Sequence, residues 1–366
     1  MNYNKEPLGS LCLKVSSGGT PKSTNAEYYD GGTIPWLNTK EVNFCRIYDT
    51  EKKITQLGLD NSAAKIIEPN RVIVAMYGAT AARVAINKIK LSTNQACCNL
   101  KIDPNKADYE YVYYCLLNEY EHLASLANGG AQQNLNSLTI KNFKIPVPDL
   151  KIQKKIVRIL SALDQKIELN NSNNRVLYSL AESIFKEKFK DKKYGDKIVG
   201  DYITPKRGKA LLSKDTIEGP VPVVAGGLEA AAHHNKSNTS APVITISASG
   251  ANAGFVRLWG EKVWSSDSSF IDDSITKNVY FWYVLLKSRQ KEIYDAQTGS
   301  AQAHIYPKHI ADMSVGDISD EEISKYNNLV TPMFEKIALN DAANIGLSAT
   351  RDLLLPKLMS GEIIDR

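Results

Sequence analysis

The stretch Leu160-Ser-Ala-Leu-Asp-Gln-Lys-Ile-Glu-Leu-Asn-Asn171 lies within a long helical pattern. From residue 151 to residue 189, apolar side chains recur every seven residues, and a second apolar set follows four residues behind the first. No proline or glycine interrupts this run. A helix of about 39 residues would be roughly 58 Å long at ~1.5 Å per residue. We therefore expect its apolar stripe to be buried against another long helix.

A second helical pattern occupies residues 319–366 and is the expected partner of the first. It opens with the capping box Ser319-Asp-Glu-Glu322. Pro332, Gly346 and Pro356 lie inside it, so we expect kinks or breaks there. Residues 151–193 carry 11 basic and 5 acidic side chains, whereas residues 319–366 carry 5 and 8. The opposite net charges favour pairing of the two helices.

The two segments repeat one another at an offset of 170 residues. Leu163 corresponds to Met333, and upstream of the helices Tyr113 corresponds to Tyr283. A constant offset over about 70 residues indicates the duplication of a domain followed by a long helix. The predicted contact residues of the helix pair are Ile156, Leu160, Leu163, Ile167, Asn170, Asn174, Leu177, Ile184, Met333, Ile337, Asn340, Asn344, Leu347 and Leu354.

Each half of the duplication begins with a region that is rich in strand signals. Residues 71–77 and 242–247 are short β-rich runs, and a Gly-Ala pair follows each. Short helices are expected around residues 109–126 and 280–294. The predicted fold class is α+β, with two globular domains separated by the long helices and related by a pseudo-two-fold internal repeat.

Composition and charge exclude several classes of protein. The 366 residues are 43% hydrophobic and 23% charged, which is ordinary for a globular protein with two or three cores. No long apolar window or signal region is present, so we expect a soluble, cytoplasmic protein without membrane contact. The five cysteines include no CxxC pair, which argues against a disulfide framework and a thiolate zinc site. The net charge of +5 favours an anionic partner only weakly.

Motifs for metal, phosphate and nuclease chemistry are incomplete. Adjacent His233 and His234 point in different directions on a strand and lack further ligands at suitable spacing. The run Ser249-Gly-Ala-Asn-Ala-Gly254 matches neither nucleotide-binding glycine pattern and is typical of tight turns. Asp164 and Lys166 fit a loose nuclease pattern but lie roughly 200° apart on a helix, so we interpret them as solvated charges. No catalytic residue and no metal are expected.

Polar, flexible segments contain side chains suited to base edges and phosphates, which favours contact with nucleic acid. The candidate residues are Thr20, Lys22, Ser23, Tyr77, Arg83, Gln132, Gln133, Asn134, Lys206, Arg207, Lys209, His233, His234, Asn235, Lys236, Asn252, Gln302 and His304. Residues 1–150 carry 16 basic and 14 acidic side chains, and residues 194–318 carry 13 of each. Phosphate contacts would therefore contribute modestly unless another protein supplies positive surface.

Several stretches resemble the specificity subunits of type I restriction-modification systems, and the resemblance covers nearly the whole chain. They are Ser17-Gly-Gly-Thr-Pro21 with Ile34-Pro-Trp36, Ile145-Pro-Val-Pro148 before Gln153-Lys-Lys-Ile156, residues 160–171, and Arg351-Asp-Leu-Leu-Leu-Pro-Lys-Leu-Met-Ser-Gly-Glu-Ile363. The second domain lacks the Gly-Gly-Thr-Pro opening. Its recognition loops are therefore the least securely placed.

The resemblance implies two target recognition domains that alternate with two long spacer helices, paired antiparallel as a coiled coil. Residues 1–149 would be the first recognition domain, 150–193 the first spacer, 194–318 the second domain and 319–366 the second spacer. Each domain would read half of a bipartite site in double-stranded DNA. The spacers would dock two modification (methyltransferase) subunits and ATP-dependent restriction subunits. The chain itself would be non-catalytic and without a cofactor, with S-adenosylmethionine and ATP on the partner subunits.

Antiparallel pairing would bring Asn170 and Asn174 of the first helix close to Asn340 and Asn344 of the second. Buried asparagines that satisfy each other fix the register of a helix pair at some cost in stability. A rigid spacer would then set the distance between half-sites. The alternative function is a coiled-coil scaffold whose globular domains bind protein or glycan. Salt-dependent binding to duplex DNA beside a methyltransferase would distinguish the two.

Overall fold

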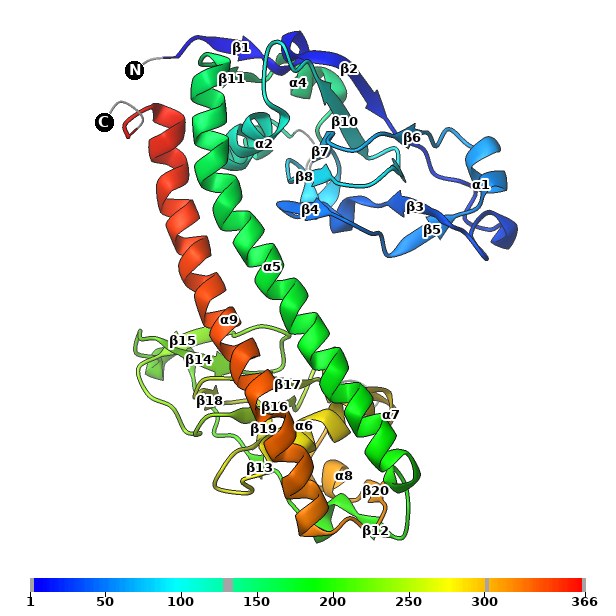
Figure 1. The fold of residues 1–366 in the computed structure, drawn as a ribbon, viewed down its shortest axis with the longest axis vertical. Helices are drawn as coiled ribbons and strands as arrows, with labels where there is room; N and C mark the ends of the chain where they lie inside the picture. The colour runs from blue at the N-terminus through cyan, green and yellow to red at the C-terminus, as the bar shows by residue number, and fades with distance from the viewer. Residues whose placement is uncertain (1–2, 128–133, 300–302, 364–366) are drawn as a thin grey trace. The chain divides into compact units, whose positions relative to one another are not determined.

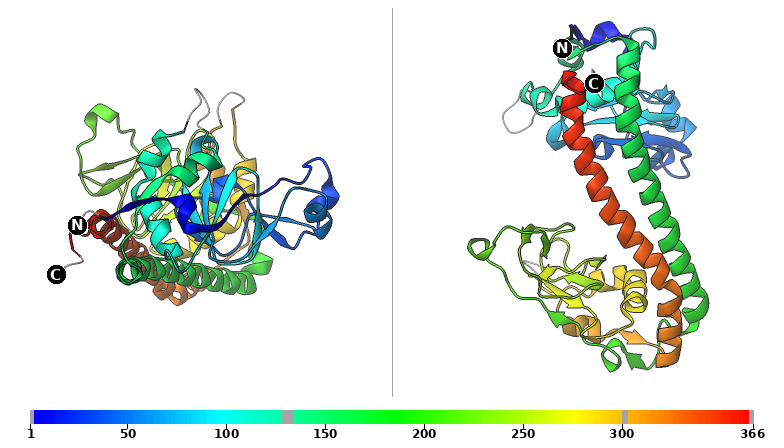
Figure 2. Two further views of the ribbon diagram at one scale, coloured as in Figure 1. Left: turned by 90° about the horizontal axis from the view of Figure 1, so that it is seen from above. Right: turned by 60° about the vertical axis from the view of Figure 1, so that its left-hand side comes forward.

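The computed structural model describes residues 3–127, 134–299 and 303–363. They form two compact units: unit 1 is Met1–Gln165 with Leu347–Arg366, and unit 2 is Lys166–Gly346. The long helices α5 (Leu150–Phe189) and α9 (Asp320–Ser360) pack antiparallel, and each contributes to both units (Figure 1; Figure 2). The α+β class and the helix predicted over residues 151–189 are confirmed. The units differ from the predicted domain boundaries because each includes one end of both helices.

Side-chain caps encoded in the sequence start both long helices. Asp149 Oδ1 accepts a hydrogen bond from Ile152 N at 2.9 Å, at the start of α5. At the start of α9, Glu322 N donates to Ser319 Oγ at 3.3 Å and Ser319 N donates to Glu322 Oε2 at 3.0 Å, which confirms the capping box.

The prediction of breaks within the second long helix was wrong, because α9 is one helix from Asp320 to Ser360. Pro332, Gly346 and Pro356 are all exposed. The carbonyls that the prolines leave without a backbone partner can therefore be hydrated. Packing of the apolar stripe supplies the stability that these residues remove from an isolated helix.

Unit 1 is built on two main sheets. One has the strand order β2-β10-β7-β8-β4, another the order β5-β3-β9-β6, and β1 pairs with β11. Asp108 Oδ1 caps the helix α2 by accepting from Glu110 N at 2.8 Å. The elements are β1 (Lys5–Pro7), β2 (Cys12–Ser17), β3 (Ile34–Leu37), β4 (Cys45–Ile47), β5 (Lys52–Ile54), α1 (Gln56–Asp60), β6 (Ile66–Ile67), β7 (Val72–Ala75), β8 (Val84–Asn87), β9 (Leu91–Thr93), β10 (Cys97–Ile102), α2 (Tyr109–Asn118), α3 (Tyr120–Ser125), α4 (Ser137–Asn142) and β11 (Lys144–Pro146).

Unit 2 repeats this plan, with fewer strands among its described residues. Its main sheet has the order β13-β19-β16-β17, another has the order β15-β14-β18, and β12 pairs with β20. The elements are β12 (Lys197–Ile198), β13 (Lys206–Arg207), β14 (Val221–Val224), β15 (Ala232–His234), β16 (Val243–Ser247), β17 (Val256–Trp259), β18 (Trp264–Ser265), β19 (Ser268–Ile271), α6 (Val279–Ser288), α7 (Gln290–Asp295), α8 (Pro307–Ala311) and β20 (Ser314–Val315). The short helices expected around residues 109–126 and 280–294 are α2 with α3 and α6 with α7.

The ends of the long helices belong to the cores of the units. Ile156 and Leu160 of α5 are buried in the unit 1 core, together with Leu358 of α9. In unit 2, Phe185 of α5 and Tyr326 of α9 are buried against α6. Full burial of such a side chain stabilises the fold by roughly 1.5–3 kcal/mol. The hydrophobic core of each unit therefore joins the main sheet of that unit to one end of the helix pair.

Candidate functional site

A repeated loop follows the central strand of each main sheet. In unit 1, β7 leads into Tyr77-Gly-Ala-Thr-Ala-Ala82, and in unit 2, β16 leads into Ser249-Gly-Ala-Asn-Ala-Gly254. Gly78 and Gly250 have φ values of 73° and 80°. Such values favour glycine, which explains why both loops carry it at this turn. In both loops, the backbone N–H of the residue three positions after the glycine donates to the glycine carbonyl at 3.0 Å.

A second chain segment lies beside each loop. Tyr77 forms an antiparallel bridge with Asn134, and Ser249 forms one with His304. The residue after each bridge adds a backbone hydrogen bond. Leu135 N donates to Met76 O at 2.8 Å, and Ile305 N donates to Ala248 O at 2.9 Å. The structure therefore brings together Tyr77 with Asn134 and, in unit 2, the Asn252 loop with His304. Gln132, Gln133 and Gln302 precede these segments and lie outside the described residues.

The unit 1 loop borders an open hollow of about 650 Å³, lined by Tyr77, Gly78 and Asn134 among others. The Tyr77 side chain is 45% exposed despite its size. Thr20 lies in a separate polar contact, where its hydroxyl donates to the side-chain oxygen of Gln95. These groups offer donors and acceptors without a fixed charge, which suits recognition of base edges.

The Gly18-Gly19-Thr20-Pro21 stretch owes its sequence to close backbone approach. A Cβ atom at Gly18 would lie 1.9 Å from the carbonyl oxygen of Thr93. Trp36 Nε1 donates to Gly19 O at 3.0 Å, which links the Gly-Gly-Thr-Pro stretch to Ile34-Pro-Trp36. Thr20, Lys22 and Ser23 are exposed in this segment. The two glycines are therefore structural, and the exposed polar residues after them remain candidates for contact.

Unit 2 places a charged group where unit 1 has Gln95. Asp267 Oδ1 lies 2.7 Å from Arg207 Nη2, and Asp267 Oδ2 accepts from the Ser249 hydroxyl. Asp267 stands 172 residues after Gln95, the same offset that relates the two loops. Sequence reasoning did not select Gln95, Ser249 or Asp267, although this offset could have identified them. Arg207 is thus oriented by a carboxylate beside the unit 2 loop.

Other candidates lie away from these loops or are partly engaged. The His234 ring is only 4% exposed, sits edge-on against Trp264 and hydrogen-bonds the backbone N of Ile217 at 3.0 Å. We therefore leave His234 out of the candidate surface. Arg83 Nη1 donates to Asn43 Oδ1 at 2.8 Å, and Lys206 Nζ donates to Ser274 Oγ at 3.0 Å. Lys209, His233, Asn235 and Lys236 are exposed.

The predicted asparagine centre of the helix pair is present within unit 2. Asn170 Nδ2 donates to Asn344 Oδ1 at 2.8 Å, and Asn340 Nδ2 donates to Asn174 Oδ1 at 2.7 Å. Asn174 also donates to Asp341 Oδ1 at 2.7 Å, and burial raises the pKa of that carboxyl. Asn170 and Asn340 are 2% and 3% exposed. A one-turn slip would bring only two of the four asparagines opposite each other and leave the other two without their partners, so the centre favours one register.

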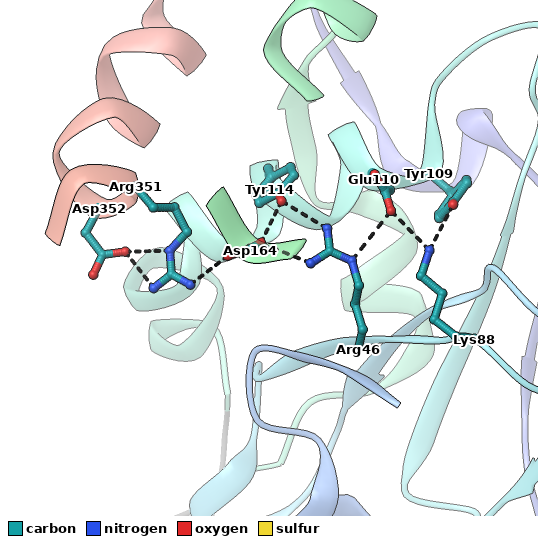
Figure 3. A network of polar contacts seen from close by, with 8 residues as sticks. All are labelled: Arg46, Lys88, Tyr109, Glu110, Tyr114, Asp164, Arg351 and Asp352. Carbon is teal, nitrogen blue, oxygen red and sulfur yellow. Dashed lines mark hydrogen bonds and ion pairs between the residues drawn. The ribbon is translucent and has the colours of Figure 1, made fainter. Parts of the chain in front are cut away.

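Asp164 is the centre of a buried ionic network in unit 1, not a solvated charge, which corrects the sequence interpretation. It is 6% exposed. Figure 3 shows Asp164 of α5 between Arg46 of β4 and Arg351 of α9, at 3.2 Å and 3.0 Å. The Tyr114 hydroxyl donates to Asp164 Oδ2 at 2.6 Å, and burial raises the pKa of Tyr114. Packing of three distant chain segments buried this carboxylate, which helix periodicity could not reveal.

The described residues include no group of three or more His, Cys, Asp or Glu side chains that could hold a metal ion. Within residues 3–127, 134–299 and 303–363, no helix combines the length and hydropathy needed to cross a bilayer. Burial raises the pKa of the Cys97 and Cys98 thiols to about 12, which disfavours the thiolate forms.

Comparisons with known proteins agree with this interpretation. A family model described as the type I restriction modification DNA specificity domain matches residues 2–179. The chain is 26% identical over 396 residues to the type I restriction enzyme MjaIX specificity subunit of Methanocaldococcus jannaschii, covering 96% of this chain and 91% of that protein. It is 27% identical over 156 residues to the EcoR124I/EcoR124II specificity subunit of Escherichia coli, covering 41% and 38%. The crystal structure of an S subunit from M. genitalium has the same fold, with a TM-score of 0.62 at 21% identity, covering 98% and 96%.

Proposed function

The chain belongs to the family of DNA specificity subunits of type I restriction-modification systems, whose role is non-catalytic, and we propose that each of its globular domains reads one half of a bipartite site in double-stranded DNA. The recognition domains are residues 1–149 and 194–318, and the spacers are residues 150–193 and 319–366. One observation carries the proposal: the same loop and adjoining segment recur in both units, as Tyr77 with Asn134 and as Ser249 with His304.

The chemistry of the two loops supports different half-sites. In unit 1, the tyrosine hydroxyl and the asparagine amide of the Tyr77–Asn134 pair can donate and accept without charge. In unit 2, Arg207 is held by Asp267, and an arginine guanidinium suits the acceptor pair on the major-groove edge of guanine. The two domains therefore recognise different base sequences, and the spacer register sets the distance between them.

Exposed apolar residues on the long helices support docking of modification subunits. Leu169, Val176 and Leu180 share one face of α5 and are 53%, 64% and 47% exposed. Leu339 of α9, which corresponds to Leu169 in the repeat, is 65% exposed. Exposed apolar surface of this kind is typical of protein interfaces. Exposed apolar residues on both long helices suit two methyltransferase subunits, which hold S-adenosylmethionine, while the ATP-dependent restriction subunits join the same cytoplasmic complex.

Duplex binding across a salt series tests the proposal against the alternative of a protein- or glycan-binding scaffold. Binding to DNA should be weak for the chain alone, because both domains are nearly neutral, and tight when modification subunits supply positive surface. The affinity of the assembled complex should fall steeply as salt rises. Affinity that is equal with and without the partner, and insensitive to salt, would contradict DNA recognition.

A further inference from the structure

The two units differ at one edge of their main sheets. In unit 1, β4 pairs in parallel with β8, and Arg46 lies opposite Ile86. In the described part of unit 2, the sheet ends at β17, and no strand takes the place of β4. The sequence explains the difference, because residues 38–51 join β3 to β5, whereas only residues 225–231 join β14 to β15. Strand β17 is therefore an edge strand, and such strands can accept a further strand.

Leu258 is the residue of β17 that corresponds to Ile86, at the offset of 172. Two residues earlier, Val256 N donates to Gln290 Oε1 and Val256 O accepts from Lys287 Nζ, each at 2.9 Å. Side chains thus satisfy Val256 on the outer edge. The backbone of Leu258 points the same way, because strand groups alternate with a period of two. Among the described residues, Leu258 has no strand partner on that edge.

A cavity of about 530 Å³ lies beside this edge, and Leu258, Tyr280, Tyr283 and Phe334 contribute to its lining. Tyr280 and Phe334 stack in parallel with ring centroids 4.9 Å apart. The Tyr283 ring meets Phe334 edge-on at 5.7 Å. The cavity therefore presents aromatic surface next to the open backbone of β17, and the charged residues Arg175 and Asp341 also line it.

The three aromatic residues correspond, at the offset of 170, to Glu110, Tyr113 and Asp164. In unit 1 these residues surround the guanidinium of Arg46, which reaches them from β4. Figure 3 shows Glu110 and Asp164 beside it. The cavity in unit 2 thus lies where unit 1 holds the side chain of its extra strand. Both carboxylates that hold the guanidinium are replaced by aromatic rings, so the unit 2 cavity suits a large apolar side chain.

A second hollow, of about 740 Å³, is lined by Arg257 and Trp259, which alternate with Leu258 along β17. Glu229, Glu261 and Asp341 line it together with Arg257. Arg257 Nη1 already pairs with Glu229 Oε2 at 2.8 Å, and its guanidinium lies 4.0 Å from the ring centroid of Trp259. The three carboxylates outnumber the single guanidinium, so this hollow favours a partner segment with basic side chains.

We propose that β17 accepts an extended segment of a partner polypeptide, with a large apolar side chain in the aromatic cavity and basic side chains near Glu229 and Glu261. Successive residues of a strand point to opposite faces, so one short segment can satisfy both hollows. Backbone pairing with the Leu258 edge supplies affinity, and the two hollows supply specificity. Unit 1 makes the equivalent contact within its own chain, through β4. This partner site is separate from DNA recognition and does not depend on it.

A peptide that copies residues 42–50 of this chain, with Cys45→Lys, Arg46→Leu and Ile47→Lys, is the probe. Fluorescence anisotropy with the labelled peptide and the full chain should show saturable binding. Two further peptides each carry one methyl group on a backbone nitrogen, at position 45 or at position 46. Only one of the two should bind about tenfold more weakly, because neighbouring N–H groups of a strand face opposite edges. Replacing the central leucine of the peptide with alanine should weaken binding about tenfold, since most of its apolar contact with the aromatic rings is then lost.

Variants of the protein test the charged face. Glu229→Lys with Glu261→Lys should weaken peptide binding about fivefold or more. Asp215→Lys with Glu218→Lys makes the same change of charge at exposed residues elsewhere in unit 2 and should leave binding unchanged. Absence of saturable binding at millimolar peptide, equal weakening by both N-methylations, or equal weakening in the two charge variants would overturn the proposal. The assay contains no DNA, so its result is independent of the DNA-recognition test.

Discussion

Asn170 and Asn344 join the two long helices through a hydrogen bond of 2.8 Å, and the internal repeat maps this bond onto the one between Asn340 and Asn174. In the repeat, Asn170 corresponds to Asn340 and Asn344 corresponds to Asn174, so exchanging the two halves of the chain converts one bond into the other. The helix pair is thus related by a local two-fold axis at its asparagine centre. A duplicated chain has here reproduced the self-complementary contact of a symmetric dimer.

Paired substitution should separate register from stability at this centre. Asn170→Leu alone should lower the free energy of unfolding by about 1–3 kcal/mol, because the Asn344 oxygen loses its buried donor. Asn170→Leu with Asn344→Leu should recover that stability and raise the melting temperature, while loosening the register. The measurements are thermal unfolding and methylation of DNA with altered spacing between half-sites. If the double variant melts below the single one, the asparagines belong to an essential buried network.

Removing Asp164 should destabilise unit 1 strongly. Asp164→Ala removes the nearer of the two carboxylates that hold the buried guanidinium of Arg46 and the partner of Arg351, which we expect to cost about 3–5 kcal/mol in the free energy of unfolding. Asp164→Phe with Arg46→Leu imitates the aromatic composition of unit 2 and should recover much of that stability. Denaturant unfolding measures the effect. Asp352→Ala, at a side chain that is 61% exposed, is the control, and an equal effect of the two alanine variants would contradict the account.

The start of α9 should give stability a specific dependence on pH. A hydrogen bond from Lys192, with further bonds from Ser319, lowers the pKa of Glu322 from 4.5 to about 2. A carboxyl with a depressed folded pKa contributes its full stability above its unfolded pKa and loses it as pH falls through the folded value.

Glu322→Gln should therefore lower the melting temperature at neutral pH, and the difference from wild type should shrink as pH falls from 4.5 to about 2. Added salt should also reduce the difference, since the Glu322 side chain is 43% exposed. Glu321→Gln, at a side chain that is 86% exposed, should show little of either effect. A difference between wild type and Glu322→Gln that is constant from pH 7 to pH 2 would exclude this role.

Periodicity predicted the long helices because a helical pattern depends on residues close in sequence, and the internal repeat with antiparallel pairing predicted their asparagine centre. The same pattern missed Phe185 and Phe334, which lie one position beyond Ile184 and Met333 and turn toward the unit 2 core. It also placed Asp164 in solvent. Those contacts depend on where each sheet packs against the helices, which the heptad pattern does not contain.

The candidate site was only partly predictable for a related reason. Polar loop composition selected Asn134 and His304, and the structure pairs them with the repeated loops. It also selected His234, whose burial against Trp264 depends on strand pairing between β14 and β15. Asp267 was missed because one carboxylate before a short strand has no local signature. Its position becomes visible only when the offset of 172 aligns it with Gln95.

Methylation mapping with loop variants tests most directly whether each unit reads its own half-site. The chain is assembled with its modification subunits, and modified adenines are located by single-molecule sequencing for wild type, Asn134→Ala and His304→Ala. Each variant should relax only one half of the recognised sequence, with discrimination reduced by about 1–3 kcal/mol for each bidentate hydrogen-bonded pair that the substitution removes. The Asn134 and His304 variants should affect opposite halves. Unchanged specificity in both variants, or relaxation of the same half by both, would contradict the account.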